Sequence, residues 1–172
     1  MNAKHLAATL VILFYLDTAH AVEFEKMGSA VGAALHAKTG ISKTNTKVKG
    51  KDVLVYQAKD GSGKVTKYAV VQQGVYPPNC THTWVVGMAP GAKVEQVRVV
   101  EMSWTHAYPT KEASFLSQFQ GKSPAQLKTL KSETTTVAKA TGSSELTADA
   151  VVTSIVAVGN LEKGGRNVAG GK

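Results

Sequence analysis

Two hydrophobic periodicities divide the chain. Between residues 23 and 38 the apolar residues recur at helical spacing, which predicts an amphipathic helix that stops near Gly40. Between residues 52 and 102 the pattern changes to short runs rich in Val, Tyr and Thr, which are typical of β-strands. Helical spacing returns after Pro109. The pattern therefore predicts a central group of strands with helices before and after it.

The central runs predict four strands in two hairpins. Residues 52–58 and 64–72 are joined by the turn-forming residues 59–63, and residues 82–88 and 93–102 are joined by a second turn at residues 89–92. Strands so close in sequence pair most simply in antiparallel fashion. The basic, Thr-rich segment 44–51 is expected to be a connection.

Three helical segments are predicted after the strands. The first starts at Thr110, has Lys111-Glu112 in its first turn and ends at Gly121. The second begins at Ser123-Pro124 and runs to Leu130, and the third spans residues 144–158. One face of the third is apolar and carries Ala148, Val151, Val152, Ile155 and Val158. The expected fold class is α+β, an antiparallel sheet of two hairpins with an N-terminal helix and C-terminal helices.

Residues 1–21 have the pattern of a secretory signal peptide. Lys4 and His5 precede the apolar run 6–16, and Ala19-His20-Ala21 is a small-x-small cleavage pattern. The apolar run is much shorter than the roughly 20 residues that span a bilayer. We therefore expect a periplasmic or secreted protein that is not an integral membrane protein, with a single domain over residues 22–162 and a flexible tail over residues 163–172.

Composition excludes several classes of site. A chain of 172 residues with 43% hydrophobic residues can bury one core. Its only cysteine, Cys80, excludes an intramolecular disulfide and any metal site built from several cysteines. The net charge is +8, but the basic residues are spread along the chain, and no nucleic-acid motif accompanies them. The sequence shows no nucleophile–base pair for hydrolysis.

Two short segments carry candidate chemistry. They are the sequence FLSQFQGK at residues 115–122 and VAKATGSS at residues 137–144, which directly precedes the last predicted helix. The small residues 141–144 would let backbone N–H groups at a helix N-terminus approach a phosphate closely. Hydroxyl groups of Ser143 or Ser144 and the charge of Lys122 or Lys139 could contribute. A simple N-cap role for Ser143 or Ser144 is the alternative.

In this order, and about twenty residues apart, the two segments resemble the FMN-binding domain family. That family includes the periplasmic flavin subunits of sodium-pumping NADH:quinone reductases and of Rnf-type complexes. The resemblance covers about residues 64–158 and implies an electron carrier more than a stand-alone enzyme. It implies an FMN site at Thr141, Gly142, Ser143 and Ser144, with Lys122 and Gln118 nearby. No catalytic residue is assigned.

The resemblance also bears on covalent attachment. In family members that hold FMN covalently, a threonine carries the flavin through its phosphate, and that position is Thr141 here. Lys139, Ala138 and Thr135 stand where the family has glycine, Ser or Thr, and an acidic residue. We therefore expect no covalent bond between FMN and Thr141 without a matching flavin transferase, and FMN held without a covalent bond and a lost flavin site both stay open.

Two questions stay open at this stage. Trp84, Trp104, Tyr108 and Phe119 are either core residues or stacking partners for a flavin ring. The alternative function is a flavin-free accessory module on the same fold, with a copper-like metal site at Cys80, His82 and His106, whose thiolate and imidazole ligands would suit that metal. The positive net charge favours an acidic redox partner protein.

The cleavage pattern gives a first testable prediction. Because Ala19-His20-Ala21 follows a short apolar run, N-terminal sequencing of the exported protein should begin at Val22. Recovery of a chain that starts at Met1 from the membrane fraction would contradict this processing.

Overall fold

The computed structural model describes residues 21–169, so the first twenty residues of the predicted signal peptide lie outside the described part. The strands are β1 (Val22–Glu23), β2 (Ile41–Val48), β3 (Lys51–Lys59), β4 (Val65–Tyr76), β5 (Cys80–Ala89) and β6 (Lys93–Met102). The α-helices are α1 (Met27–Leu35), α2 (Ala113–Leu116), α3 (Leu130–Glu133) and α4 (Thr141–Ala169), and the 3-10 helices are η1 (Thr105–Lys111), η2 (Ser117–Phe119) and η3 (Pro124–Gln126). The predicted α+β class with an antiparallel sheet is confirmed.

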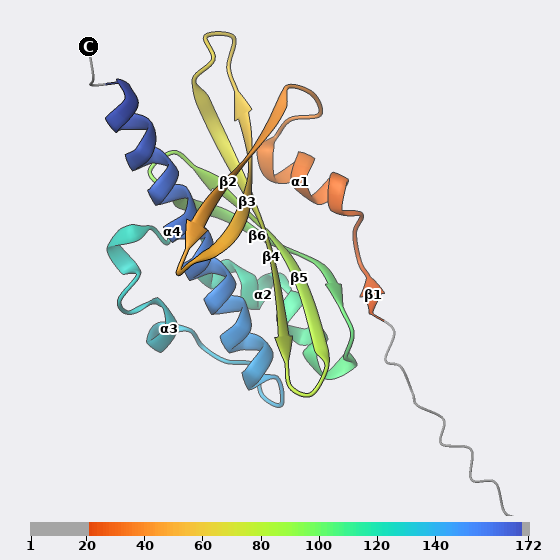
Figure 1. The fold of residues 1–172 in the computed structure, drawn as a ribbon. Coiled ribbons are helices and arrows are strands. Elements are labelled where there is room, and N and C mark those ends of the chain that lie inside the picture. Colours follow the sequence, from red (N-terminus) through yellow and green to blue (C-terminus); the bar gives the residue numbers. More distant parts are fainter. Residues whose placement is uncertain (1–20, 170–172) are drawn as a thin grey trace, which may run out of the picture.

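The sheet has six strands in the order β1-β6-β5-β4-β3-β2, and all neighbours are antiparallel (Figure 1). Both predicted hairpins are present, as β3 with β4 and β5 with β6. The expectation that residues 44–51 form a connection is wrong, because β2 occupies most of that segment and pairs with β3. Its half-buried positions are held largely by threonines, which weakened the hydrophobic alternation in the sequence.

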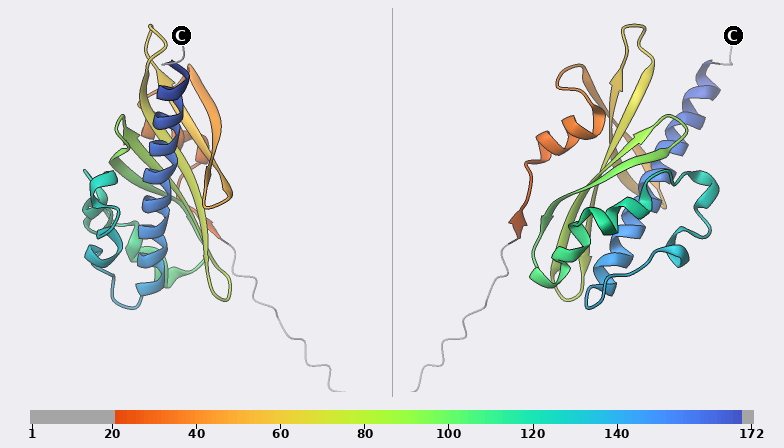
Figure 2. Two further views of the ribbon diagram at one scale, coloured as in Figure 1. Left: turned by 60° about the vertical axis from the view of Figure 1, so that its left-hand side comes forward. Right: turned by 180° about the vertical axis from the view of Figure 1, so that it is seen from behind.

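Helices cover both faces of the sheet (Figures 1 and 2). On one face, Val70, Trp84 and Val86 form a core with Val151 and Ile155 of α4. On the other face, α1 forms a separate core between Ala30, Ala34 and Leu35 and the sheet residues Ala69 and Val85. The predicted apolar face of the last helix is therefore the face that is buried.

The last helix is longer than predicted. It starts at Thr141 rather than at residue 144, and it continues to Ala169, through most of the segment 163–172 that was expected to be a flexible tail. The mobility of that tail stays a prediction. Among residues 21–169, none of the helices has both the length and the apolar character needed to cross a bilayer.

The region between the sheet and α4 differs from the predicted pair of helices over residues 110–130. It contains only short helical segments, which are η1, α2, η2, η3 and α3. Gly121, with a φ of 77°, turns the chain, and backbone bonds of Gly121 and Lys122 to Val94 attach this turn to β6. Buried Phe115 and Phe119 anchor the segment to the same core as α4. The apolar spacing reflects these anchors rather than a continuous helix.

The contact between α1 and the sheet gives a second prediction. A Cβ atom on Gly87 of β5 would lie 2.9 Å from Gln96 Cγ, 3.1 Å from Ala34 Cβ and 3.2 Å from the Ala34 carbonyl oxygen. Gly87→Ala should therefore lower the free energy of unfolding by about 1–3 kcal/mol, as other overpacked cores do.

Gly61→Ala is the matched control, because no atom lies within 4 Å of a Cβ at Gly61. Its effect in urea unfolding should stay within about 0.5 kcal/mol. Equal losses of stability in the two variants would show that α1 does not pack against Gly87.

Candidate functional site

A pocket of about 320 Å³ opens at the first turn of α4. Its lining residues come from the β4–β5 turn, the segment after β6 and the start of α4, and they are Tyr76, Cys80, Trp104, His106, Ala107, Lys139, Ala140, Thr141, Gly142 and Ser143. The pocket thus brings together the candidate phosphate loop and two members of the cysteine–histidine set, which the sequence analysis treated as separate sites.

Thr141 and Gly142 form the floor of this pocket at the N-terminus of α4. Thr141 is exposed and is the first residue of the helix, whose first N–H groups have no partner within the helix. A Cβ atom on Gly142 would lie 2.1 Å from Cε2 of Tyr76, so the tyrosine ring packs directly on the glycine backbone. Tyr76 is 44% exposed and forms a wall of the pocket.

Ser143 connects α4 to the sheet through a buried hydrogen bond. Its Oγ lies 3.0 Å from Nε2 of His82, and Nδ1 of the same ring lies 3.2 Å from the carbonyl oxygen of Cys80. A carbonyl only accepts hydrogen bonds, so Nδ1 carries the proton of the neutral ring, and the Ser143 hydroxyl donates to Nε2. The exposed fractions are only 1% for His82 and 6% for Ser143.

The environment of His82 favours the neutral ring. Burial lowers its pKa below the ordinary value of 6.5, although the bond to the Cys80 carbonyl acts in the opposite direction. The indole ring of Trp84 stacks on the imidazole, with ring centres 5.2 Å apart and planes within 14°. The indole Nε1 of Trp84 is buried and has no hydrogen-bond partner among the described residues.

The hydroxyl group of Ser144 forms hydrogen bonds with the backbone of the loop that leads into α4. Its buried Oγ donates to the carbonyl oxygen of Ala140 at 2.9 Å and accepts from the backbone N–H of Val137 at 3.0 Å. Ser144 therefore closes the loop that leads into α4. Because α4 begins at Thr141, Ser143 and Ser144 lie within its first turn, and the expectation that one of them is the N-cap is wrong.

Lys122 and Gln118 are not among the residues that line the pocket. Lys122 Nζ forms an ion pair with Glu133 at 3.0 Å. The Gln118 amide accepts from the backbone N–H of Thr135 at 2.9 Å and donates to its carbonyl oxygen at 3.3 Å. Both side chains thus hold the segment 133–135, which precedes the loop that leads into α4.

The geometry gives the metal alternative no support. Residues 21–169 contain no group of three His, Cys, Asp or Glu side chains that could hold a metal ion. Cys80 Sγ lies 3.9 Å from His82 Nδ1, but both nitrogens of that ring are already hydrogen-bonded. Burial also raises the pKa of the Cys80 thiol, which disfavours the thiolate that binds metals.

The four candidate aromatic residues lie in different parts of the structure. Trp104 lines the pocket, whereas Trp84 and Phe119 are buried in the core. Tyr108 makes an edge-on contact with Phe24 at 5.0 Å. Tyr76 was missed, although its place in the Pro-rich β4–β5 turn was visible in the sequence.

The chain matches no family model, no curated protein and no solved structure.

The neutral, buried His82 gives a third prediction. Below about pH 6.5 the unfolded chain binds a proton at this position that the folded chain does not bind, so stability should fall as the pH is lowered. His82→Gln should remove this part of the pH dependence, measured by urea unfolding between about pH 7.5 and about pH 5.5.

His106→Gln is the control, because His106 is exposed. This variant should keep the pH dependence of the native chain. An unchanged slope in His82→Gln would show that the pKa of His82 is the same in the folded and the unfolded chain.

Proposed function

We propose that this protein is an exported electron carrier that binds FMN in the pocket at the start of α4. The observation that supports this most is the combination of exposed Thr141 on a helix N-terminus with two aromatic walls, Tyr76 and Trp104, in a single pocket. A flavin nucleotide has the same two parts, an anionic phosphate and a flat aromatic ring. The sequence resemblance to the FMN-binding domain family agrees with this assignment.

The phosphate end of the ligand would lie over the first turn of α4. The backbone N–H groups of Thr141, Gly142 and Ser143 and the positive end of the helix dipole favour an anion there. Lys139 lines the same pocket and is exposed, so it can add positive charge and hydrogen bonds. The Ser143 hydroxyl group is hydrogen-bonded to His82, so Ser143 would bind the phosphate through its backbone N–H group.

The aromatic end of the ligand would lie between the pocket walls. Tyr76 and Trp104 can stack on an isoalloxazine ring and shield it from water. FMN supplies the electron-transfer chemistry when it is bound. The protein binds and orients it, and the net charge of +8 favours an acidic partner as the donor or acceptor of electrons.

The test compares two ligands that differ only in the phosphate. Titrations followed by flavin fluorescence should show that the native chain binds FMN more tightly than riboflavin. Lys139→Ala should weaken FMN about tenfold, which corresponds to about 1.4 kcal/mol, and should leave riboflavin unchanged. Lys128→Ala, which removes an equal charge from an exposed position outside the pocket, should change neither affinity.

Two results would contradict the proposal in different ways. Equal affinity for FMN and riboflavin would show that the start of α4 does not bind the phosphate. Flavin fluorescence that survives denaturation of protein purified from cells, and that disappears in Thr141→Val, would show a covalent bond where we expect none.

A further inference from the structure

Strands β3 and β4 are paired along only part of their length. These strands pair only from Val55 opposite Val70 to Lys59 opposite Val65. In contrast, β2 and β3 stay paired as far as Val48 and Lys51, and β4 and β5 as far as Tyr76 and Cys80. Residues 51–54 and 71–76 therefore diverge, and each segment has one edge without a strand partner among the described residues.

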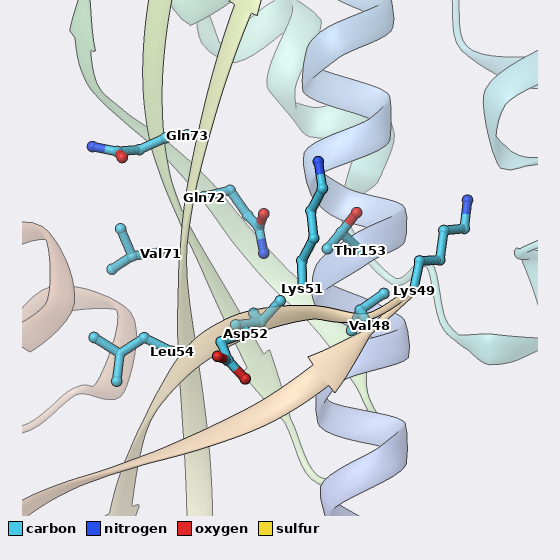
Figure 3. Close-up of a pocket in the computed structure, with 10 residues that line it drawn as sticks. Val48, Lys49, Lys51, Asp52, Leu54, Val71, Gln72, Gln73 and Thr153 are labelled. Atoms are coloured by element: carbon cyan, nitrogen blue, oxygen red, sulfur yellow. The ribbon is translucent and has the colours of Figure 1, made fainter.

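A pocket of about 560 Å³ fills this wedge between β3 and β4. It is lined by Val48, Lys49, Lys51, Asp52, Val53, Leu54, Val71, Gln72, Gln73 and Thr153. Figure 3 shows the side chains of Lys51 and Gln72 on the side of the sheet where α4 carries Thr153. The helix thus closes one face of the wedge.

The polar groups in the wedge favour a negatively charged ligand. Gln72 Nε2 is a buried donor without a partner among the described residues. Asp52 is paired with Lys47 at 3.3 Å, whereas Lys49 and Lys51 form no ion pair within residues 21–169. Two ammonium groups and an amide donor are therefore available to carboxylate oxygens.

The free edge of β4 also ends in exposed apolar side chains. Val75 is 54% exposed and Tyr76 is 44% exposed, the highest values among the large hydrophobic residues of the described part. An unpaired strand edge with exposed apolar residues is a template for an added strand. Residues 71–76 offer about 20 Å of such an edge.

We propose that the wedge binds an extended acidic segment of a partner protein, which adds as a strand to β4 over residues 71–76. Backbone hydrogen bonds to the edge provide affinity, and an Asp or Glu side chain of the segment lies beside Lys51 and Gln72. A second copy of this chain is a poorer occupant, because its net charge of +8 opposes the lysines. The inference does not require the flavin site, and its test uses the chain without FMN.

The experiment selects random octapeptides displayed on phage against the exported chain. Enriched sequences should alternate apolar and acidic residues, and synthetic fluorescein-labelled versions should bind by fluorescence anisotropy. The double variant Lys49→Glu with Lys51→Glu should weaken them at least tenfold. Lys43→Glu with Lys59→Glu, which reverses the charge of two exposed lysines on β2 and β3 outside the wedge, is the control and should retain most of the affinity.

Hydrogen exchange then locates the bound peptide. Amide protons within residues 71–76 should exchange more slowly in the complex. Gln72→Leu should weaken peptide binding without lowering the free energy of unfolding, since it replaces a buried donor that has no partner among the described residues. Three results would overturn the proposal. The selected peptides could lack acidic residues, the two double variants could bind the peptides equally well, or the peptide could slow amide exchange at residues 137–144 instead of residues 71–76. A dimer of the native chain that is blocked by Val75→Lys would assign the edge to a second copy.

Discussion

The hydrogen bond from Ser143 to His82 fixes the first turn of α4 against β5, and the geometry of the pocket depends on it. The bond is buried, so the loss of either partner would leave the other unsatisfied at a cost of about 1–3 kcal/mol. The Cys80 carbonyl and the Trp84 ring hold the imidazole in place from the strand side. Because the helix start is fixed in this way, Thr141 and Gly142 face Tyr76 at a defined distance.

Much of the fold could be predicted from local patterns. Valine-rich runs marked the central strands, and the spacing of Val151, Ile155 and Val158 marked the buried face of the last helix. The hydrophobic pattern did not predict the structure correctly where side chains are only partly buried or where turns interrupt a helix. Threonines carry the inward positions of β2, and Phe115 and Phe119 anchor short turns that have the spacing of a helix without its continuity.

The candidate site could be predicted only in part, because its members lie far apart in the sequence. Thr141 and Gly142 were identifiable from their small size just before a helix, and the structure places them in the pocket. The family resemblance implied Lys122 and Gln118, but these side chains pair with Glu133 and Thr135 and do not line the pocket. No local spacing indicates that Ser143 contacts His82, since these residues meet only through the packing of α4 against β5.

The order of the strands also has a consequence for assembly. From β2 to β6 each strand pairs with its neighbour in sequence, so most of the sheet consists of local contacts that form quickly. In contrast, β1, α1 and α4 contact the sheet across long sequence distances: β1 pairs with β6, α1 packs on β4 and β5, and α4 bonds to β5. The pocket therefore exists only when the C-terminal helix has docked on the sheet, because the first turn of α4 lines it. A ligand that binds only the finished pocket would hold that helix in place by mass action.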